Sequence, residues 1–239
     1  MKIALIGYGK MGKEIEQQAL SNGDEIVLRA DAHHVLSVKD LKHADVAIEF
    51  TQPDAAVKNI RLCFEANVAV VVGTTGWYDD LRMITIECEA KNQSLLYASN
   101  FSVGVNIFFE LNRRLAQMMD KQTEYDVEID ETHHTQKLDK PSGTAISLAN
   151  GIMTELHSKT GWQLDEQKKY PGEKLLIHSH RVDDVPGTHV VTYHSAVDTI
   201  EIKHTAHNRK GFAKGALLAA TWLVGKQGVF SMKDVLFKQ

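Results

Sequence analysis

The sequence of 239 residues is short of cysteine and of long apolar runs. Its two cysteines, Cys63 and Cys88, have the spacing of neither a metal site nor a redox motif, so we expect buried, reduced thiols and a reducing compartment. The longest uncharged apolar stretch, residues 215–225, has 11 residues, against about 20 for a membrane-spanning helix. No internal repeat or low-complexity tract is visible.

The sequence also lacks an excess of basic residues. Its net charge of −4 gives no reason to expect nucleic acid as a partner. Only four apolar residues, 3–6, separate Lys2 from Gly7, so the start of the chain does not resemble a signal peptide. We therefore expect a cytoplasmic protein with no membrane partner. Since 43% of its residues are hydrophobic, it can bury one large core or two small ones.

A glycine motif, Gly7-x-Gly9-x-x-Gly12, follows the first apolar run. It lies between an expected strand at residues 2–6 and an expected helix with one apolar face. This context is typical of dinucleotide binding, because the glycines permit a tight turn, approach of the backbone to a pyrophosphate and close packing of helix on strand. The helix N-terminus adds free amides for the phosphates. The alternative is a strand-to-helix turn that binds nothing.

Asp31 ends the expected second strand, residues 25–30. In dinucleotide-binding folds an acidic residue about 20 positions after the glycines bonds the adenosine ribose. Because Ala32 follows, and not an arginine or lysine, we expect NADH in preference to NADPH, although Arg29 or His33 could still reach a 2′-phosphate. The alternative interpretation of Asp31 is an ordinary turn residue.

Strand and helix patterns alternate up to about residue 103. The expected strands are residues 45–51, 68–73 and 94–102, and the expected helices are residues 52–67 and 79–91. This alternation predicts a parallel sheet covered on both faces, as in a Rossmann-type domain. The polar loops Gly73–Thr75 and Ala98–Phe101 follow two of these strands, at the edge where such sheets bind ligands.

The pattern changes after Gly104. Following a helix at residues 106–119, alternation with period two predicts four strands, at residues 125–134, 174–180, 188–196 and 198–206. We therefore expect a smaller α+β domain with an open mixed β-sheet, for substrate binding and oligomerisation. The apolar helix 211–226 fits the first domain better. The expected domains are thus 1–103 completed by 209–239, and 104–208.

One face of the second sheet is expected to stay uncovered once helices pack on the other. We expect Val190, Ile200 and Ile202 to lie on that face, at one set of alternate positions. A leftover apolar face often marks an oligomer interface. This face is therefore the predicted surface for self-association.

The stretch Glu131 to Ala145, ETHHTQKLDKPSGTA, lies between an expected strand and an expected helix. The helix start at Gly143 and Thr144 offers free amides and a hydroxyl to a carboxylate, and Lys137 adds a positive charge. One of the two adjacent histidines can donate a proton near neutral pH. We therefore expect an anion cradle with an acid beside it, suited to reduction of an anionic imine by a nicotinamide.

Two other interpretations of these histidines stay open. The adjacent rings could lie on opposite faces of a strand end and have no role. They could also belong to a metal site, since nine of the twelve histidines fall between His133 and His207, and His178-x-His180 would place two rings on one face. No cysteine, HExxH motif or carboxylate triad accompanies them, so we expect no metal.

The same stretch resembles the signature E-x-H-H-x-x-K-x-D-x-P-S-G-T-A of the dihydrodipicolinate reductase (4-hydroxy-tetrahydrodipicolinate reductase) family of lysine and diaminopimelate biosynthesis. The blocks GYGKMG, VGTTGW, ASNFSVGVN and HNRKGFAKGALLAATWL resemble further family blocks in the same order. The resemblance implies reduction of 4-hydroxy-tetrahydrodipicolinate, a small dicarboxylate, to tetrahydrodipicolinate and water with NADH or NADPH. It also implies a homotetramer assembled through the sheet of the second domain.

The resemblance implies a role for each site residue. His133 would be the general acid, and Lys137 would stabilise the developing negative charge. The residues implied to bind the substrate are His134, Gly143, Thr144 and Arg209. The residues implied to bind the cofactor are Gly7, Tyr8, Gly9, Lys10, Met11, Gly12, Asp31, Gly73, Thr74, Thr75, Ala98, Ser99, Asn100 and Phe101.

The chain departs from the family pattern at Lys140, where a small residue usually precedes the proline. It also looks shorter than other family members, mostly between Gly12 and Val70, a region that bears on cofactor preference. Two other functions compete with the resemblance. Another Rossmann reductase, such as an aspartate dehydrogenase, would share the glycine motif without HHxxKxDxPSGT. A non-catalytic dinucleotide sensor would need a DNA-binding or partner-binding element, which the sequence does not show.

Overall fold

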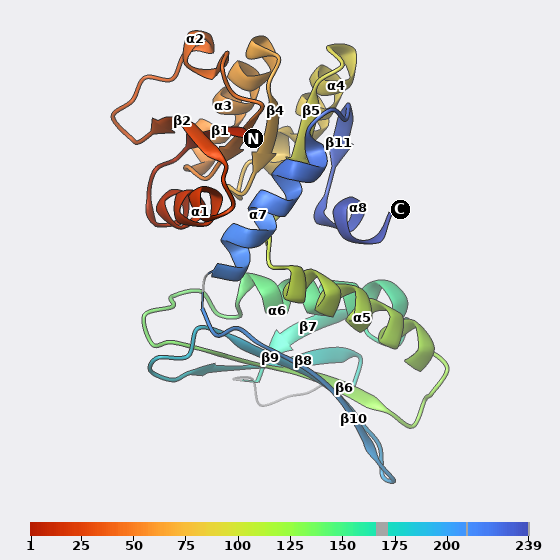
Figure 1. The fold of residues 1–239 in the computed structure, drawn as a ribbon. Coiled ribbons are helices and arrows are strands. Elements are labelled where there is room, and N and C mark those ends of the chain that lie inside the picture. Colours follow the sequence, from red (N-terminus) through yellow and green to blue (C-terminus); the bar gives the residue numbers. More distant parts are fainter. Residues whose placement is uncertain (166–171, 209, 239) are drawn as a thin grey trace. The chain divides into compact units, whose positions relative to one another are not determined.

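The structure is a computed structural model that describes residues 1–165, 172–208 and 210–238. The chain forms two compact units (Figure 1). The first comprises Met1–Val103 and Lys210–Gln239, and the second comprises Gly104–Arg209. Among the described residues, no helix combines the length and the apolar character that a membrane crossing requires.

A six-stranded parallel sheet forms the centre of the first unit, in the order β11-β5-β4-β3-β1-β2. Its strands are β1 (Lys2–Ile6), β2 (Glu25–Ala30), β3 (Val46–Glu49), β4 (Ala69–Val72), β5 (Ser94–Tyr97) and β11 (Gly228–Phe230). The strand order reverses at β1, which has β2 on one side and β3 on the other. Open α/β sheets bind ligands at such a switch point, beyond the carboxyl ends of the strands.

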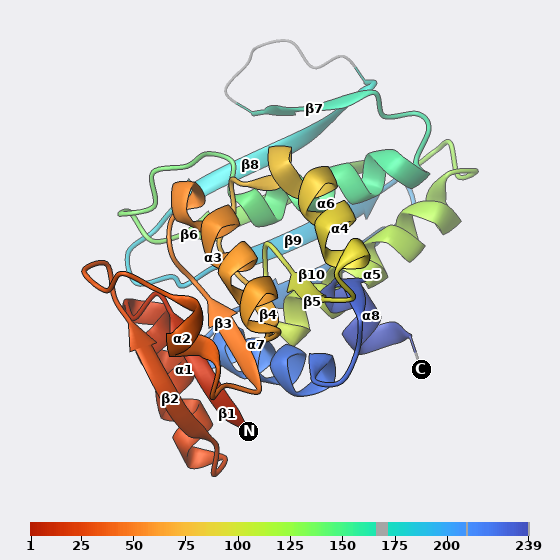
Figure 2. The ribbon, with the colours of Figure 1, turned by 90° about the horizontal axis from the view of Figure 1, so that it is seen from above.

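Helices cover both faces of this sheet (Figure 2). Those on one face are α1 (Lys10–Ser21), α7 (Lys210–Leu223) and α8 (Met232–Phe237), and those on the other are α3 (Pro53–Ala66) and α4 (Leu81–Ala90). The short helices α2 (Val38–Leu41) and η1 (Tyr78–Asp80) lie in connections. Because both faces are covered, central strands such as β4 are apolar runs with buried residues on either side. The predicted Rossmann-type fold is confirmed.

Close packing requires two of the glycines in the loop after β1. Gly7 has a φ of +98°, and a Cβ there would overlap the Phe50 carbonyl beyond the end of β3. A Cβ on Gly12 would overlap the Gly7 carbonyl, so α1 packs directly on the loop. Gly9, in contrast, has no non-neighbouring atom within 4 Å of the position of a Cβ. Its backbone therefore faces open space, as a backbone that approaches a pyrophosphate must.

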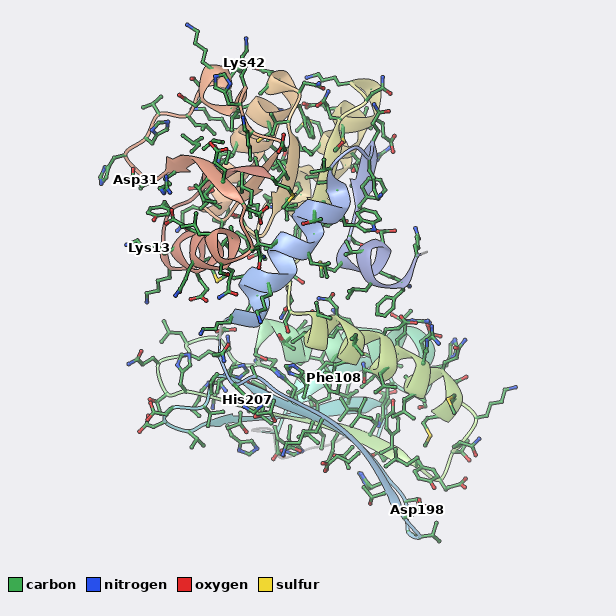
Figure 3. The ribbon with its side chains drawn as sticks, viewed as in Figure 1. Lys13, Asp31, Lys42, Phe108, Asp198 and His207 are labelled. Carbon is green, nitrogen blue, oxygen red and sulfur yellow. The ribbon has the colours of Figure 1, made fainter. Side chains whose placement is uncertain are left out.

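A five-stranded mixed sheet with two helices on one face forms the second unit (Figure 1). In the order β10-β9-β6-β8-β7, its strands are β10 (Thr199–Thr205), β9 (Thr188–His194), β6 (Asp126–His133), β8 (Lys174–Arg181) and β7 (Gly161–Leu164). The helices are α5 (Val103–Met119) and α6 (Gly143–Glu155). Phe108 of α5 points toward the sheet and is buried in the core of this unit (Figure 3). The predicted open mixed sheet is confirmed.

The register of the β9–β10 hairpin corrects one expectation. Ile200 lies opposite Tyr193 and Ile202 lies opposite Val191. Cross-strand partners share a face, and Tyr193 and Val191 are buried in the core with the helices. Val190 is on the other face, as the alternation along β9 requires. The prediction that Val190, Ile200 and Ile202 share the uncovered face was wrong, because a hairpin's register depends on its turn as well as on the apolar pattern.

Among the described residues, four short elements lie outside those predicted: α2, β7, β11 and α8. β11 has three residues and pairs with β5 at the edge of its sheet. α2 has four residues, and a capping box between Ser37 and Asp40 starts it. Elements of this length are too short to show a period, so neighbouring strands and caps define them instead of the apolar pattern.

Candidate active site

The carboxyl edge of the first unit's sheet gathers the loops that were predicted to bind a cofactor. Residues 7–9 follow β1, Asp31 follows β2, residues 73–75 follow β4 and residues 98–101 follow β5. In parallel strands these ends all lie at one edge. Segments that are far apart in the sequence therefore meet around the switch point at β1.

The amides of the glycine loop fall into two groups, one that bonds to the protein and one that remains suited to a ligand. The amides of Gly7 and Tyr8 donate to the Ala30 carbonyl at 2.8 and 3.0 Å, so they fasten the loop to β2. α1 begins immediately afterwards, at Lys10. The first amides of a helix have no partner within it, and the helix dipole makes this end partly positive. The amides of residues 10–12 are therefore the ones suited to a pyrophosphate.

Asp31 lies on the loop after β2 and is exposed to solvent (Figure 3). Its carboxylate accepts a hydrogen bond from the His33 amide at 2.9 Å. Arg29, the nearest arginine in the sequence, directs its guanidinium to Glu16, with Nε 2.6 Å from Oε1. The Tyr8 hydroxyl donates to the same carboxylate group. Glu16 therefore neutralises the cation that a 2′-phosphate would need.

Glu49 is a fully buried acid at the end of β3 that the sequence analysis did not single out. The Thr51 hydroxyl and the Asn59 side-chain amide donate to its Oε1, the latter at 3.3 Å, and the Thr51 main-chain amide donates to the Thr74 hydroxyl at 2.7 Å. Burial raises the pKa of Glu49, and these donors oppose the rise only in part. The network ties the ends of β3 and β4 together. Its sequence signal is an acid inside the apolar run VAIEF.

The other predicted cofactor residues occupy the loops after β4 and β5. A Cβ on Gly73 would overlap the Phe50 ring, so this loop packs tightly on that side chain. Phe101 is 2% exposed, and its ring centroid lies 5.8 Å from that of Phe50. Its side chain therefore supports the loop from the core. The exposed or half-buried members of the set are Gly73, Thr75, Ala98, Ser99 and Asn100.

In the second unit, His133 is the last residue of β6 and is held by Glu131. Residues two apart on a strand share a face, so both side chains point toward the core. His133 Nδ1 is hydrogen-bonded to the Glu131 carboxylate, whose other oxygen lies 3.0 Å from Arg181 Nη1. Burial alone would raise the pKa of Glu131, but its partners His133 and Arg181 outweigh burial and lower that pKa to about 2. Glu131 is therefore a buried carboxylate.

Arg181 also fastens the loop after β6, which carries Lys137. Its guanidinium donates to the main-chain carbonyls of Lys137 at 3.2 Å and of Asp139 at 2.6 Å. The Lys137 ammonium lies 2.9 Å from the Asp139 carboxylate. Partial burial works to raise the pKa of Asp139, but the bond from Lys137 lowers it below its usual range. The lysine is thus held as one half of an ion pair.

The predicted anion cradle lies at the N-terminus of α6. Ser142 caps it, because its hydroxyl oxygen accepts a hydrogen bond from the Ala145 amide at 3.2 Å. Gly143 is exposed, with no non-neighbouring atom within 4 Å of the position of a Cβ, and Thr144 is half-buried. The first amides of the helix and its partial positive charge suit a carboxylate.

His189 of β9 closes the buried side of this cluster. Its Nε2 lies 3.0 Å from the Ser142 hydroxyl, and its ring meets that of His133 edge-on, with centroids 5.0 Å apart. Burial, together with the charge of His133, lowers the pKa of His189 to about 3, so the ring is neutral at physiological pH. Nothing in the sequence marks His189 or Arg181 for this cluster, because strand pairing brings them to β6 from distant parts of the chain.

The predicted catalytic and substrate-binding residues that the structure describes all lie on β6, on the connection to α6 or at the start of α6: His133, His134, Lys137, Gly143 and Thr144. His134 is half-buried, and its carbonyl accepts a hydrogen bond from the Lys137 amide at 3.1 Å. Arg209 lies outside the described residues. The strand end and the helix start therefore carry the second half of the candidate site.

One group of three side chains among the described residues, Glu131, His133 and His189, has the spacing of a metal site. Its candidate ligand atoms lie within 4.8 Å of one another, and two imidazoles with a carboxylate suit zinc. However, His133 Nδ1 and Glu131 already bond each other, and the Arg181 guanidinium beside Glu131 repels a cation. The arrangement favours a hydrogen-bonded histidine over a metal centre.

Two family models match the chain and together cover almost all of it. The model described as dihydrodipicolinate reductase, N-terminus, matches residues 1–101, and the one described as dihydrodipicolinate reductase, C-terminus, matches residues 104–236. The chain belongs to the dihydrodipicolinate reductase family. The resemblance inferred from the motif between Glu131 and Ala145 is confirmed.

Members of the dihydrodipicolinate reductase family match this chain along its whole length. A 4-hydroxy-tetrahydrodipicolinate reductase of Christiangramia forsetii is 49% identical over 239 residues, which cover 99% of this chain and 98% of the relative. That of Methanosarcina mazei is 36% identical over 98% of this chain and 88% of its own. The solved structure of a dipicolinate-bound dihydrodipicolinate reductase from Paenisporosarcina sp. TG-14 has a TM-score of 0.81 at 25% identity and covers 97% of each chain.

Proposed function

We propose that this protein reduces 4-hydroxy-tetrahydrodipicolinate to tetrahydrodipicolinate and water with a nicotinamide dinucleotide, in lysine and diaminopimelate biosynthesis. The observation that carries the proposal is the connection from β6 to α6. It joins a histidine bound to a buried carboxylate, a lysine and an open helix N-terminus within fifteen residues, Glu131 to Ala145. The relative that is 49% identical is named for the same reaction.

The substrate is a dicarboxylate, and the N-terminus of α6 suits one of its carboxylates. The amides of Gly143 and Thr144 and the Thr144 hydroxyl supply hydrogen-bond donors, and the helix dipole supplies partial positive charge. His134, which belongs to the family motif, and Arg209, which lies where the family has an arginine, complete the proposed substrate-binding set. This end of the helix needs no rearrangement to accept an anion, because the space at Gly143 is open.

His133 is the proposed general acid, and Lys137 stabilises the negative charge that develops on the substrate. A bound nicotinamide supplies the hydride, and the protein then has to supply one proton. An imidazole is the side chain that most often serves as a general acid, and His133 provides one at this position. Lys137 is a fixed cation, so it lowers the energy of a transition state that carries negative charge.

The first unit fits a dinucleotide cofactor, since Gly9 leaves its backbone open and α1 presents free amides behind it. We propose a preference for NADH over NADPH. The Asp31 carboxylate can bond two ribose hydroxyls but repels a 2′-phosphate. Arg29, which could offset that repulsion, is paired with Glu16. NADPH would therefore bind more weakly unless that pair opens.

We further propose a homotetramer that assembles through the sheet of the second unit. Among the described residues, both helices of this unit pack on one face of the sheet. The other face carries paired charges: His178 lies between Asp165 and Glu128, and His180 pairs with Asp130. Light scattering on the purified protein would measure the number of chains. We propose a cytoplasmic location, which suits the two free thiols, Cys63 and Cys88.

Replacing the proposed acid and cation tests this function. We expect His133→Gln to lower kcat by about 100-fold or more, because general acid catalysis typically contributes 10²- to 10⁴-fold. The Kd for NADH should stay unchanged. Lys137→Ala should also lower kcat. The matched controls are His157→Gln, which changes a histidine that is 83% exposed, and Lys140→Ala, which changes another lysine of the same loop.

The outcome separates the competing functions. A dinucleotide sensor would bind NADH and turn over nothing, with or without the substitutions. A reductase for another imine would oxidise NADH with a different substrate. If His133→Gln and Lys137→Ala both kept the turnover of the unsubstituted enzyme, the assignment of the site would be wrong.

A further inference from the structure

The Glu131–Arg181 pair forms a buried junction that joins three parts of the candidate site. Glu131 accepts hydrogen bonds from the His133 ring and, at 3.3 Å, from the Ser142 amide at the start of α6. Arg181 adds its bonds to the loop carbonyls of Lys137 and Asp139. One ion pair therefore fixes the proposed acid, the loop of the proposed cation and the cap of the anion-binding helix.

The junction also determines which ring nitrogen of His133 carries the fixed proton. An ionised carboxylate can only accept hydrogen bonds, and Glu131 is ionised because Arg181 and the Ser142 amide stabilise its charge. Nδ1 must therefore be the donor in its bond to Glu131. The neutral ring then has a bare Nε2, and the proton that can be exchanged is the one at Nε2.

Gly187, which precedes β9, lies beside that second nitrogen. A Cβ built on Gly187 would lie 2.9 Å from His133 Nε2 and 3.2 Å from Cδ2. Any side chain here would therefore press on the edge of the ring that exchanges the proton. Because glycine has no Cβ, another group can approach Nε2 from this side to within hydrogen-bond distance.

We propose that Glu131, held by Arg181, is a positioning residue that fixes the Nδ1–H form of His133 and so directs its proton to leave from Nε2, in the space that Gly187 leaves free. This proposal rests on the proposed function, in which His133 is the acid. The titratable groups in contact with the His133 ring are Glu131 on β6 and His189 on β9. Arg181 on β8 pairs with Glu131, and the charges of Lys137 on the loop and His204 on β10 act on His189.

Glu131→Gln tests the proposal, because it keeps the shape of the side chain and removes its charge. We expect kcat to fall by about 100-fold, with the Kd for NADH unchanged. The alkaline limb of the kcat–pH profile should move to lower pH, because an imidazolium without its carboxylate loses its proton more easily. Glu131→Asp keeps the charge and should keep the limb in place, even if the rate falls. A purely structural role would lower the rate without moving the limb, and that result would overturn the proposal.

Asp120→Asn is the matched control. Asp120 also bonds a histidine, with Oδ1 3.1 Å from Nδ1 of the exposed His157, in the same unit. This substitution should change neither kcat nor the pH profile. Gly187→Ala provides a second variant, and it should lower kcat because its methyl group would crowd Nε2. Unchanged kcat in Gly187→Ala would contradict the direction of proton transfer.

The tautomer of His133 can be read without any assay of turnover. Nitrogen NMR of protein labelled at histidine distinguishes a protonated from a bare ring nitrogen, and His133→Gln identifies the signal. We expect Nδ1–H and a bare Nε2 in the neutral ring of the unsubstituted protein. An Nε2–H form would overturn the proposal even if Glu131→Gln failed to fold. This readout also distinguishes the two claims, since the tautomer could be right while the substrate is wrong.

Discussion

At the scale of single residues, two buried glutamates show how the same side chain takes opposite states. Glu131 has an arginine and two further donors, and its pKa falls to about 2. Among the described residues Glu49 has only neutral hydrogen-bond donors, and burial raises its pKa. Its second carboxyl oxygen, Oε2, is buried and has no hydrogen-bond partner in the part of the chain that the structure describes. The difference follows from the partner set, since the charged partners of Glu131 stabilise its ionised form more strongly than the neutral donors of Glu49 do.

The raised pKa of Glu49 predicts a pH-dependent stability. A carboxyl whose pKa is raised by folding holds its proton more tightly in the folded state. The free energy of unfolding therefore falls as the pH rises from the ordinary glutamate range, about 4.3, through the raised pKa. Glu49→Gln cannot ionise, so its stability relative to the unsubstituted protein should increase over that window. Urea unfolding at pH 5 and pH 8 measures the difference, and an equal difference at both values would contradict this account.

Asp31 governs the predicted cofactor preference. Asp31→Asn removes the charge that is proposed to bind the ribose hydroxyls, and a hydrogen bond to a charged group is worth about 1.5–3 kcal/mol. We expect kcat/KM with NADH to fall by about 10-fold or more and the preference over NADPH to shrink or reverse. Glu25→Gln, at the opposite end of β2, is the control and should change neither value. An unchanged ratio in Asp31→Asn would refute the role of this carboxylate.

At the scale of elements, α7 shows how a small residue places a whole helix. A Cβ on Gly215 would overlap the Phe101 carbonyl, whereas a Cβ on Gly211 would meet only the Ser102 hydroxyl, at 3.7 Å. We expect Gly215→Ala to lower the free energy of unfolding by about 1–3 kcal/mol. Gly211→Ala, on the same helix, should leave it unchanged or raise it by up to about 1 kcal/mol. Denaturant unfolding of the two variants checks this, and equal stabilities would contradict the close packing.

Long, periodic elements were the ones that the sequence predicted well. The strand–glycine–helix start, the buried strands of the first sheet and the β9–β10 hairpin show patterns that local physics determines. The register of that hairpin and the three-residue β11 depend on turns and neighbouring strands, so the apolar pattern of the sequence could not predict them.

Some residues of the candidate site could be predicted from the sequence and others could not. His133, Lys137 and Gly143 lie within one motif, so their shared location could be predicted. Glu131 could have been found as well, because it lies two residues before His133 on a strand and must share its face. Arg181 and His189 could not have been found, because the pairing of β8 and β9 with β6 brings them there. Those strands are far from β6 in the sequence, and the periodicity of a sequence does not show which distant strands pair.

At the scale of the whole molecule, the chain builds its first unit from both ends of the sequence. Residues after Lys210 return to supply α7, α8 and the edge strand β11, and α7 contributes seven buried residues to that unit. The second unit is a continuous segment that carries the proposed acid, the proposed cation and the helix proposed to bind an anion. The proposed reaction needs a cofactor on one unit and a substrate on the other, so neither unit should catalyse it alone.

The most direct test of the central claim is the oxidation of the nicotinamide cofactor, followed by absorbance. The substrate would be made in place from pyruvate and aspartate semialdehyde by the preceding synthase, with NADH and NADPH in parallel. The account predicts oxidation that depends on the substrate and is faster with NADH. No oxidation with either cofactor, from protein that binds NADH, would contradict the proposed function and leave only the fold in place.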